Sequence, residues 1–197
     1  FKSKAYGMKD LNVINDNMLR CRKCSLCPNC VPGSGHPDAK IMLVGEAPGE
    51  NEALIQRPFV GLAGQLLDKM LLNAGLIRSN LYITNMVKGR PSTNDGAKNR
   101  PPTPEEVQLC RGWLWQEIQS IEPEVIVMLG KIPTYTLLNA QLKKTFTMKS
   151  ILGNHFSTDY YDGLFVPLYH PSFLQQYSSE YVGRCTEILA TLNDLTV

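Results

Sequence analysis

The chain has 197 residues, a formal net charge of +2 and 43% hydrophobic residues. This length favours one domain with a substantial core, and we expect residues 1–197 to form a single domain. The small net charge excludes nucleic-acid binding through bulk charge, so any such function must rest on a local basic patch. No apolar run approaches the roughly 20 residues of a membrane span, and no signal peptide is visible. We therefore expect a cytoplasmic protein that does not enter a membrane.

Continuous apolar runs alternate with segments of helical periodicity along the chain. In chain order, the patterns predict a polar lead-in with room for one helix (1–20), a strand (41–44), a helix (61–76), a strand (81–87), a helix from Thr103, a strand (124–130), a short helix (133–141), a strand (164–172) and a closing helix (180–195). Strands that are apolar throughout are typical of a sheet covered on both faces. The sequence therefore predicts an α/β fold with a parallel or mixed sheet.

Two helix boundaries carry specific signals. Thr103 precedes Pro104 and two glutamates, which is typical of an N-cap, a proline in the first turn and acids at the positive end of the helix dipole. Gly75 is the expected stop of the helix over 61–76. A long polar loop, rich in Pro and Asn, is expected over 90–104.

Unusual residues follow three of the predicted strands, at the end of the sheet where α/β folds bind ligands. The Gly- and Pro-rich segment 45–64 lets backbone N–H groups approach a ligand, but its spacing fits neither a dinucleotide fingerprint nor a P-loop. The amide of Asn85 can read a pyrimidine edge or form a local turn bond. His170 is one of three histidines and is either a site residue or a satisfied structural group.

Four of the six cysteines are crowded into a Cys-rich loop over 20–35. They are Cys21, Cys24, Cys27 and Cys30, at three consecutive Cys-x-x-Cys steps. A disulfide framework would distribute its cysteines over a small secreted chain. The run instead predicts a metal ion or an iron–sulfur cluster in a reducing compartment, and the alternative is a set of free thiols. Cys110 and Cys185 are isolated in the sequence.

The motifs at the strand ends occur together and in a fixed order. GEAPGENEALIQRPFVGLAGQLL, YITNMVKGRP, PTPEEVQLC and HPSFL resemble the family 4 uracil-DNA glycosylases, the thermostable iron–sulfur type, over about residues 20–190. Related domains of phage DNA polymerases share these motifs. The resemblance implies a three-layer α/β/α sandwich around a central, mostly parallel four-stranded sheet. It also implies the activity, which is hydrolysis of the N-glycosidic bond of a uracil flipped out of DNA to leave an abasic site and free uracil.

By this resemblance, the catalytic residues are Glu46, Asn85 and His170. Phe59 would stack on the flipped uracil, Asn85 would read its O4 and N3–H, and His170 would stabilise negative charge at O2. The substrate pocket would consist of Gly45, Ala47, Pro48, Gly49, Phe59, Asn85 and His170. Ala47 stands where the best-known uracil glycosylases carry an Asp that positions water. Glu46 or main-chain groups must then orient the water, or leaving-group stabilisation supplies most of the rate.

The resemblance also implies the contacts to DNA. The residues expected to bind DNA are Lys88, Arg90, Ser172 and Leu174, with further basic groups at Lys98 and Arg100. Basic groups add salt-sensitive affinity, and Leu174 would fill the gap left by the flipped base. Gln175 stands where the family has an Arg, which puts one phosphate contact in doubt. The expected partner is uracil-containing DNA, single- or double-stranded, and the expected oligomeric state is a monomer.

A [4Fe–4S] cluster is implied as well, but one of its ligand positions is changed. The family pattern places its ligands at Cys21, Cys24, position 89 and Cys110, and position 89 is Gly89. Cys27 or Cys30 would then supply the fourth thiolate; alternatively, the four consecutive cysteines bind zinc, or the site is empty.

These departures from the family pattern keep other functions open. One alternative is a DNA-binding module, with weak or no activity, in a larger DNA-processing protein such as a polymerase. A weaker alternative is a different target base, such as hypoxanthine or a modified uracil.

Overall fold

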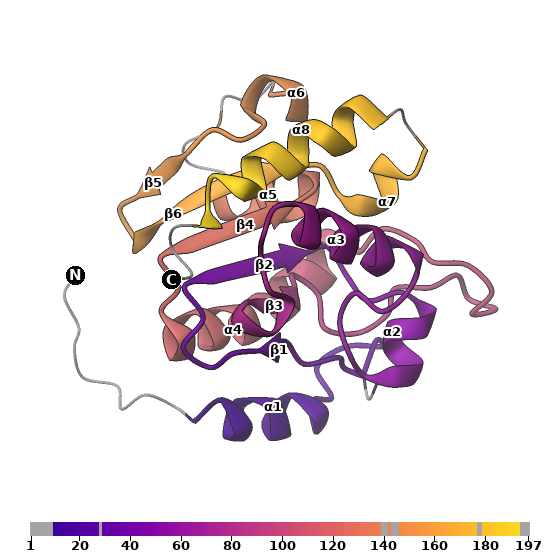
Figure 1. Cartoon of the computed structure of the whole chain (residues 1–197). Coiled ribbons are helices and arrows are strands. Elements are labelled where there is room, and N and C mark those ends of the chain that lie inside the picture. The colour runs from indigo at the N-terminus through magenta and orange to yellow at the C-terminus, as the bar shows by residue number, and fades with distance from the viewer. Residues whose placement is uncertain (1–9, 28, 139–141, 143–145, 177–178, 194–197) are drawn as a thin grey trace.

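The computed structural model describes residues 10–27, 29–138, 142, 146–176 and 179–193. Within these residues, the centre of the fold is a six-stranded sheet with the order β1-β3-β2-β4-β6-β5 (Figure 1). The strands are β1 Ser34–Gly35, β2 Ile41–Gly45, β3 Tyr82–Asn85, β4 Val125–Leu129, β5 Phe156–Thr158 and β6 Tyr161–Leu168. The central strands β3, β2, β4 and β6 are parallel, and β1 and β5 pair antiparallel at the edges. The expected four-stranded sheet is therefore right for the centre and lacks the two edge strands.

The helices lie where helical periodicity predicts them, with several short additions. They are α1 Leu11–Leu19, α2 Glu50–Ile55, α3 Leu62–Asn73, α4 Pro104–Ile121, α5 Lys131–Leu138, α6 Met148–Ile151, α7 Pro171–Leu174, α8 Ser179–Ala190 and a 3-10 turn, η1 Arg78–Asn80. The predicted ends at 139–141 and 194–195 lie outside the described residues. None of the helices in the described part of the chain has the length and apolar character of a membrane span.

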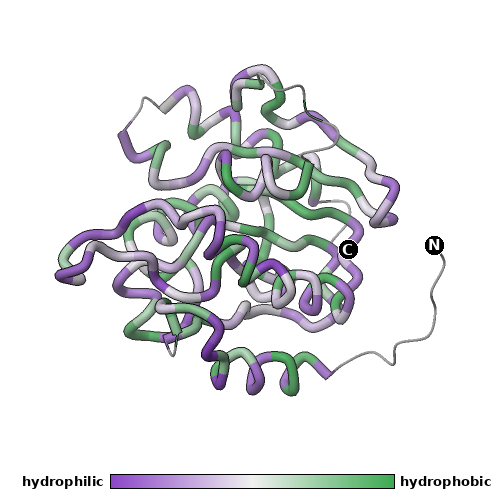
Figure 2. The backbone as a smooth tube through the Cα atoms, turned by 180° about the vertical axis from the view of Figure 1, so that it is seen from behind, coloured by the Kyte–Doolittle hydropathy of each residue, from purple (hydrophilic) through white to green (hydrophobic). Residues whose placement is uncertain are grey.

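Helices cover both faces of the sheet, as in a three-layer α/β/α sandwich. One core lies between the sheet and α3, α7 and α8, and the other lies between the sheet and α4 and α5. Leu43 belongs to the first core and Val44 to the second, because successive side chains of a strand point to opposite faces. The central strands are accordingly hydrophobic along the backbone, whereas the loop that follows β3 is largely hydrophilic (Figure 2).

The boundary signals act as expected. Thr103 Oγ1 accepts the N–H of Glu106 at 3.2 Å, and Glu106 accepts the N–H of Thr103 at 2.7 Å, which is a capping box at the start of α4. Gly75 follows α3 with a φ of 77°, where a residue with a side chain would be strained. These signals thus fix the start of α4 and the end of α3.

A small third core lies on the outer side of α4. It joins α1 to the Cys-rich loop and contains Ile14, Met18, Cys21 and Cys30, with Trp113 of α4 packed against it. The N-terminal segment is thus attached to the sandwich through α4.

Candidate active site

A cavity of about 610 Å³ opens at the carboxyl ends of the parallel strands. Its walls come from segments 46–52, 59–63, 99–101, 130–131 and 170–173, with Asn85 and Pro91. This volume lies within the range of small-molecule sites. The structure thus brings eight of the expected site residues to one cavity: Glu46, Ala47, Pro48, Gly49, Phe59, Asn85, His170 and Ser172.

Gly45 lies below this cavity at the end of β2, in register with Asn85. A Cβ atom at position 45 would lie 2.4 Å from Asn85 Oδ1 and 2.5 Å from the ring of Phe59. Gly45 therefore acts by having no side chain, because only then do the amide and the ring both fit against the strand end.

Asn85 has a buried acceptor without a partner. The residue is 2% exposed, and among the described residues nothing donates a hydrogen bond to its Oδ1 atom. Buried polar atoms in native proteins are nearly always paired. Because Asn85 lines the cavity, its free oxygen is available to a donor there.

Phe59 is held in a strained backbone conformation. Its φ is 53°, a region that costs a non-glycine residue about 1–3 kcal/mol and persists only when the surroundings enforce it. A Cβ at Gly64 would lie 2.0 Å from the Phe59 carbonyl oxygen, so only glycine admits this turn. The ring is 5% exposed and lies 5.8 Å from the ring of His170, at an angle of 35°. The backbone conformation at Phe59 therefore helps to fix where its ring lies.

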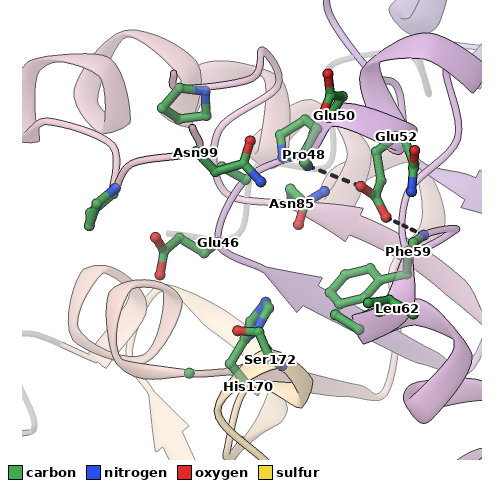
Figure 3. Close-up of a pocket in the computed structure, with 18 of the residues that line it drawn as sticks. Glu46, Pro48, Glu50, Glu52, Phe59, Leu62, Asn85, Asn99, His170 and Ser172 are labelled. Atoms are coloured by element: carbon green, nitrogen blue, oxygen red, sulfur yellow. Dashed lines mark hydrogen bonds between the residues drawn. The ribbon is translucent and has the colours of Figure 1, made fainter. Parts of the chain in front are cut away.

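His170 is a neutral donor. Burial lowers the pKa of His170 to about 4, although the charge of Glu52 opposes the shift. The backbone N–H of Ser172 donates to Nδ1 at 3.2 Å. In the neutral ring the proton then belongs on Nε2, which is free to donate to a ligand (Figure 3).

Two carboxylates lie beside the cavity with different surroundings. Glu46 lines the cavity with its carboxylate turned away from Asn85 (Figure 3), and burial raises the pKa of this carboxyl group. Glu52 instead accepts hydrogen bonds from the backbone N–H groups of Gly49, Val60 and Gly61. The sequence analysis did not single out Glu52; the available signal was its position three residues after the Gly49 N-cap, as in a capping box.

Two residues expected to bind DNA are buried, and those predictions are wrong. Lys88 is 0% exposed and its ammonium group forms an ion pair with Glu117 of α4. Leu174 is 1% exposed and belongs to the core under α7. The preceding residue, Phe173, lines the cavity, is 38% exposed and stacks on Tyr169.

The other expected DNA contacts lie near the cavity rim. Ser172 lines the rim and is exposed. Arg90 donates to Asn99 Oδ1 at 2.7 Å and lies 3.7 Å from Glu50. Arg100 is held by a two-pronged ion pair with Glu106, so it fixes the 90–104 loop rather than projecting freely. Lys131, which the sequence analysis missed, is exposed on the rim at the start of α5.

Five thiols gather between the Cys-rich loop and α4. The Sγ atom of Cys27 lies 3.9 Å from that of Cys24 and 3.4 Å from that of Cys30. Burial raises the pKa of Cys30 to about 11, with a smaller contribution from the nearby thiols of Cys21, Cys110 and Cys24 and an opposing one from a hydrogen bond with Cys27. Among the described residues, no three cysteine, histidine or acidic side chains are placed to hold a single metal ion.

Gly89 lies directly opposite Cys30. The two residues form an antiparallel bridge, and a Cβ at position 89 would lie 2.6 Å from both the Cβ and the carbonyl oxygen of Leu26. The Cys-rich loop therefore occupies the space that a side chain at position 89 would need.

The fold and the cavity define an α/β protein whose cavity, at the carboxyl ends of the parallel strands, is lined by polar groups and the ring of Phe59. A profile of the Uracil DNA glycosylase superfamily matches residues 32–196, and the chain belongs to this superfamily. It is 37% identical over 186 residues to a type-4 uracil-DNA glycosylase of Archaeoglobus fulgidus, covering 88% of this chain and 91% of that protein. It is 38% identical over 171 residues to the type-4 enzyme of Saccharolobus solfataricus, covering 84% and 77%.

A DNA polymerase of Bacillus phage SP01 is also similar. The identity is 30% over 168 residues, which cover 84% of this chain and 17% of the polymerase. The family resemblance drawn from the motifs is thus confirmed, including its phage polymerase relatives.

Proposed function

We propose that this protein removes uracil from DNA by hydrolysing the N-glycosidic bond of a flipped-out nucleotide. The observation that carries the proposal is the pairing of a buried, unpartnered acceptor on Asn85 with a neutral donor on His170, across one cavity that Phe59 also lines. Uracil presents an N3–H donor and carbonyl acceptors at O2 and O4 on a flat ring. The polar groups of the cavity are complementary to that pattern.

The same groups account for base selection. Asn85 Oδ1 accepts the N3–H of uracil, and its amide N–H donates to O4. Cytosine has an acceptor at N3 and a donor at C4, so both contacts would become repulsive. Phe59 stacks on the ring face, which is tolerant of sequence but requires a flat base.

Bond cleavage leaves negative charge on the uracil and positive charge on the sugar. His170 donates from Nε2 to O2, where the negative charge grows, and no proton has to leave the ring because the histidine is already neutral. Ala47 has no polar side chain, so Glu46 is the group that we assign to the water and to the cationic sugar. For these two tasks Glu46 must be ionised.

The test is excision of uracil from a single strand and from a duplex, read on a gel after alkaline cleavage of the abasic site. Strand cleavage only with uracil-containing DNA supports the proposal. Binding of DNA without cleavage would instead support the inactive-module alternative, which the similarity to a phage polymerase favours. Cleavage of hypoxanthine but not uracil would change the substrate.

For the DNA itself, we propose that the rim of the cavity holds the backbone. Lys131 and Arg90 supply positive charge beside the flipped nucleotide. Ser172 lies at the rim, and its hydroxyl turns from His170 Nδ1, 2.7 Å away, to a phosphate when DNA binds. Phe173 replaces Leu174 as the candidate to fill the gap left by the flipped base, because Phe173 lines the cavity and Leu174 is buried. The protein acts as a monomer in this proposal.

We further propose a [4Fe–4S] cluster held by Cys21, Cys24, Cys110 and Cys30, with Cys27 as the alternative to Cys30. Directly opposed residues of an antiparallel pair project to the same side, so a thiol at position 30 reaches the space that a thiol at position 89 would face. A single zinc ion held by Cys21, Cys24, Cys27 and Cys30 is the alternative to the cluster, and it would leave Cys110 free. When bound, the cluster links the N-terminal segment to α4.

Iron content tests this ligand set. Protein purified without oxygen should contain about four irons per chain and absorb near 400 nm. Cys30→Ser should lose both, whereas Cys27→Ser and the control Cys185→Ser should keep them. Loss in Cys27→Ser alone would make Cys27 the ligand; zinc or no metal in the unaltered protein would overturn the cluster.

The thiols also support a location. All six cysteines lie among the described residues and are free. Free thiols and a cluster are stable in a reducing compartment, and we propose the cytoplasm.

A further inference from the structure

One buried carboxylate connects the two sides of the cavity. Glu52 is 9% exposed; its Oε2 accepts the N–H of Gly49 at 3.1 Å, and its Oε1 accepts those of Val60 and Gly61 at 2.8 Å each (Figure 3). Gly49 and Gly61 are the N-caps of α2 and α3, and neither has a side chain with which to cap. Glu52 thus places a carboxylate where two helix starts present unpaired N–H groups.

The segment that Glu52 holds contains the strained residue. Phe59 directly precedes Val60 and has a φ of 53°. On the other side, Arg78 donates to the carbonyl oxygen of Pro58 at 2.8 Å. A charged side chain therefore holds the backbone on each side of Phe59, Arg78 before it and Glu52 after it. Of the two, Glu52 also accepts a hydrogen bond from Gly49 on the opposite wall of the cavity.

We propose that Glu52 is a positioning residue that fixes the Phe59 ring relative to the Gly49 backbone, and so sets the width of the slot for the flipped base. The inference rests on the proposed uracil excision. The two oxygens of Glu52 are engaged by three backbone donors, so the carboxylate acts through Phe59 and not on the base. Without it, the N–H groups of Val60 and Gly61 lose their acceptor and the strained turn is free to relax.

A double-mutant cycle separates this role from a merely structural one. Glu52→Ala should lower the single-turnover rate on uracil-containing DNA by about 100-fold in the otherwise unaltered protein. In a Phe59→Ala background, the same change should cost less than about threefold, because the ring that Glu52 positions is already gone. Equal losses in both backgrounds would overturn the inference.

The conservative variant provides a graded response. Glu52→Gln keeps one oxygen for Val60 and Gly61 but turns an amide N–H₂ toward the N–H of Gly49. We expect about a tenfold loss of rate, between the unaltered protein and Glu52→Ala. Glu105→Gln, an exposed acid in the first turn of α4, is the matched control and should leave the rate unchanged. Thermal unfolding of each variant verifies that it is folded.

A readout without catalysis keeps the inference distinct from the proposed function. Hydrogen exchange at the amides of Val60 and Gly61 should be at least about tenfold faster in Glu52→Ala than in the unaltered protein or in Glu105→Gln. If the unaltered protein does not excise uracil, the proposed function fails, and this exchange still tests the hold on Phe59. Unchanged exchange in a folded Glu52→Ala would refute the inference whatever the activity.

Discussion

Asn85 and Lys88 are three residues apart on the same segment, both polar and both buried, yet their surroundings are opposite. The Lys88 ammonium group pairs with Glu117 and donates to Thr84 Oγ1 at 2.6 Å. The carboxylate of Glu117 also accepts from the hydroxyls of Tyr82 and Thr84 and from the N–H of Gly33. Asn85 Oδ1, in contrast, has no donor among the described residues.

The difference separates scaffold from site. A buried polar group that makes all its hydrogen bonds stabilises one arrangement of the chain. A buried polar group that lacks a hydrogen-bond partner costs free energy until a ligand supplies that partner. The Lys88–Glu117 pair ties the segment after β3 to α4, three residues beyond Asn85. Asn85 is therefore held in place by its satisfied neighbours.

The largest effect is expected from breaking the ion pair between Lys88 and Glu117. Lys88→Met leaves the Glu117 charge buried without its cation, and we expect a loss of about 3–5 kcal/mol in the free energy of unfolding. Urea or thermal unfolding measures it. Lys88→Met combined with Glu117→Gln should recover part of the loss, because the uncompensated charge is then gone.

An exposed pair provides the control for this prediction. Lys40 and Glu124 form an ion pair with side chains that are 57% and 49% exposed. Lys40→Met should cost less than about 1 kcal/mol. A similar loss in Lys40→Met and Lys88→Met would mean that burial of the pair has no special weight.

Among the residues that line the cavity, the largest effect is expected at His170. His170→Ala removes the donor to O2, and we expect the single-turnover rate to fall about 10²–10³-fold, as for loss of one oxyanion donor. DNA binding should change little, because the donor is needed mainly when charge develops. The exposed His155→Ala is the control. Equal losses in binding and rate would make His170 a DNA-holding residue.

The next largest effect on excision is expected from changing the side-chain amide of Asn85. Asn85→Asp replaces the donor to O4 with a second acceptor, and we expect uracil excision to fall about 10²-fold or more. The new carboxylate is buried without a donor among the described residues, so the unfolding temperature should fall as well, and the rates are compared at a temperature at which the variant is folded. Unchanged excision in a folded Asn85→Asp would remove Asn85 from base reading.

The sequence could predict the sandwich but not which polar residues are satisfied. The four central strands and the helices α3, α4 and α8 are long enough for their periodicity to be read. The strands β1 and β5 have two and three residues, and their pairing with distant strands decides them. Lys88 looks like an exposed base after a strand, because its partner Glu117 follows 29 residues later on another element.

Prediction of the site was limited in the same way. Family motifs led to Asn85, Phe59 and His170, which line the cavity, whereas they did not reveal that Leu174 is buried, because a four-residue helix is too short for its buried side to be predicted. Glu52 was missed because its role depends on Val60 and Gly61, which only the fold brings to it. Local signals thus pointed to residues that line the cavity, whereas long-range contacts determine what holds them in place.

A smaller effect, on pH dependence, tests the ionisation of Glu46. Burial holds the pKa of Glu46 above its ordinary value of 4.5. If the carboxylate must be charged, excision is present above this raised pKa and is lost as pH falls through it. The His170 pKa of about 4 adds no change between about pH 5 and 8. Glu46→Gln should be slower and lack this acid limb; a limb that persists in the variant would assign it elsewhere.

The smallest expected effect concerns Lys131, the exposed counterpart of Lys88. Lys131 lies on the rim, so it can reach a phosphate without being desolvated, whereas Lys88 cannot leave Glu117. Lys131→Ala should weaken binding of uracil-containing and ordinary DNA alike, by less than about tenfold, and reduce the slope of log affinity against log salt by about 0.9. The rate at saturating enzyme should not change, since no base contact is lost. Lys149→Ala, an exposed lysine on α6, is the control, and an equal effect there would show that Lys131 contributes only general surface charge.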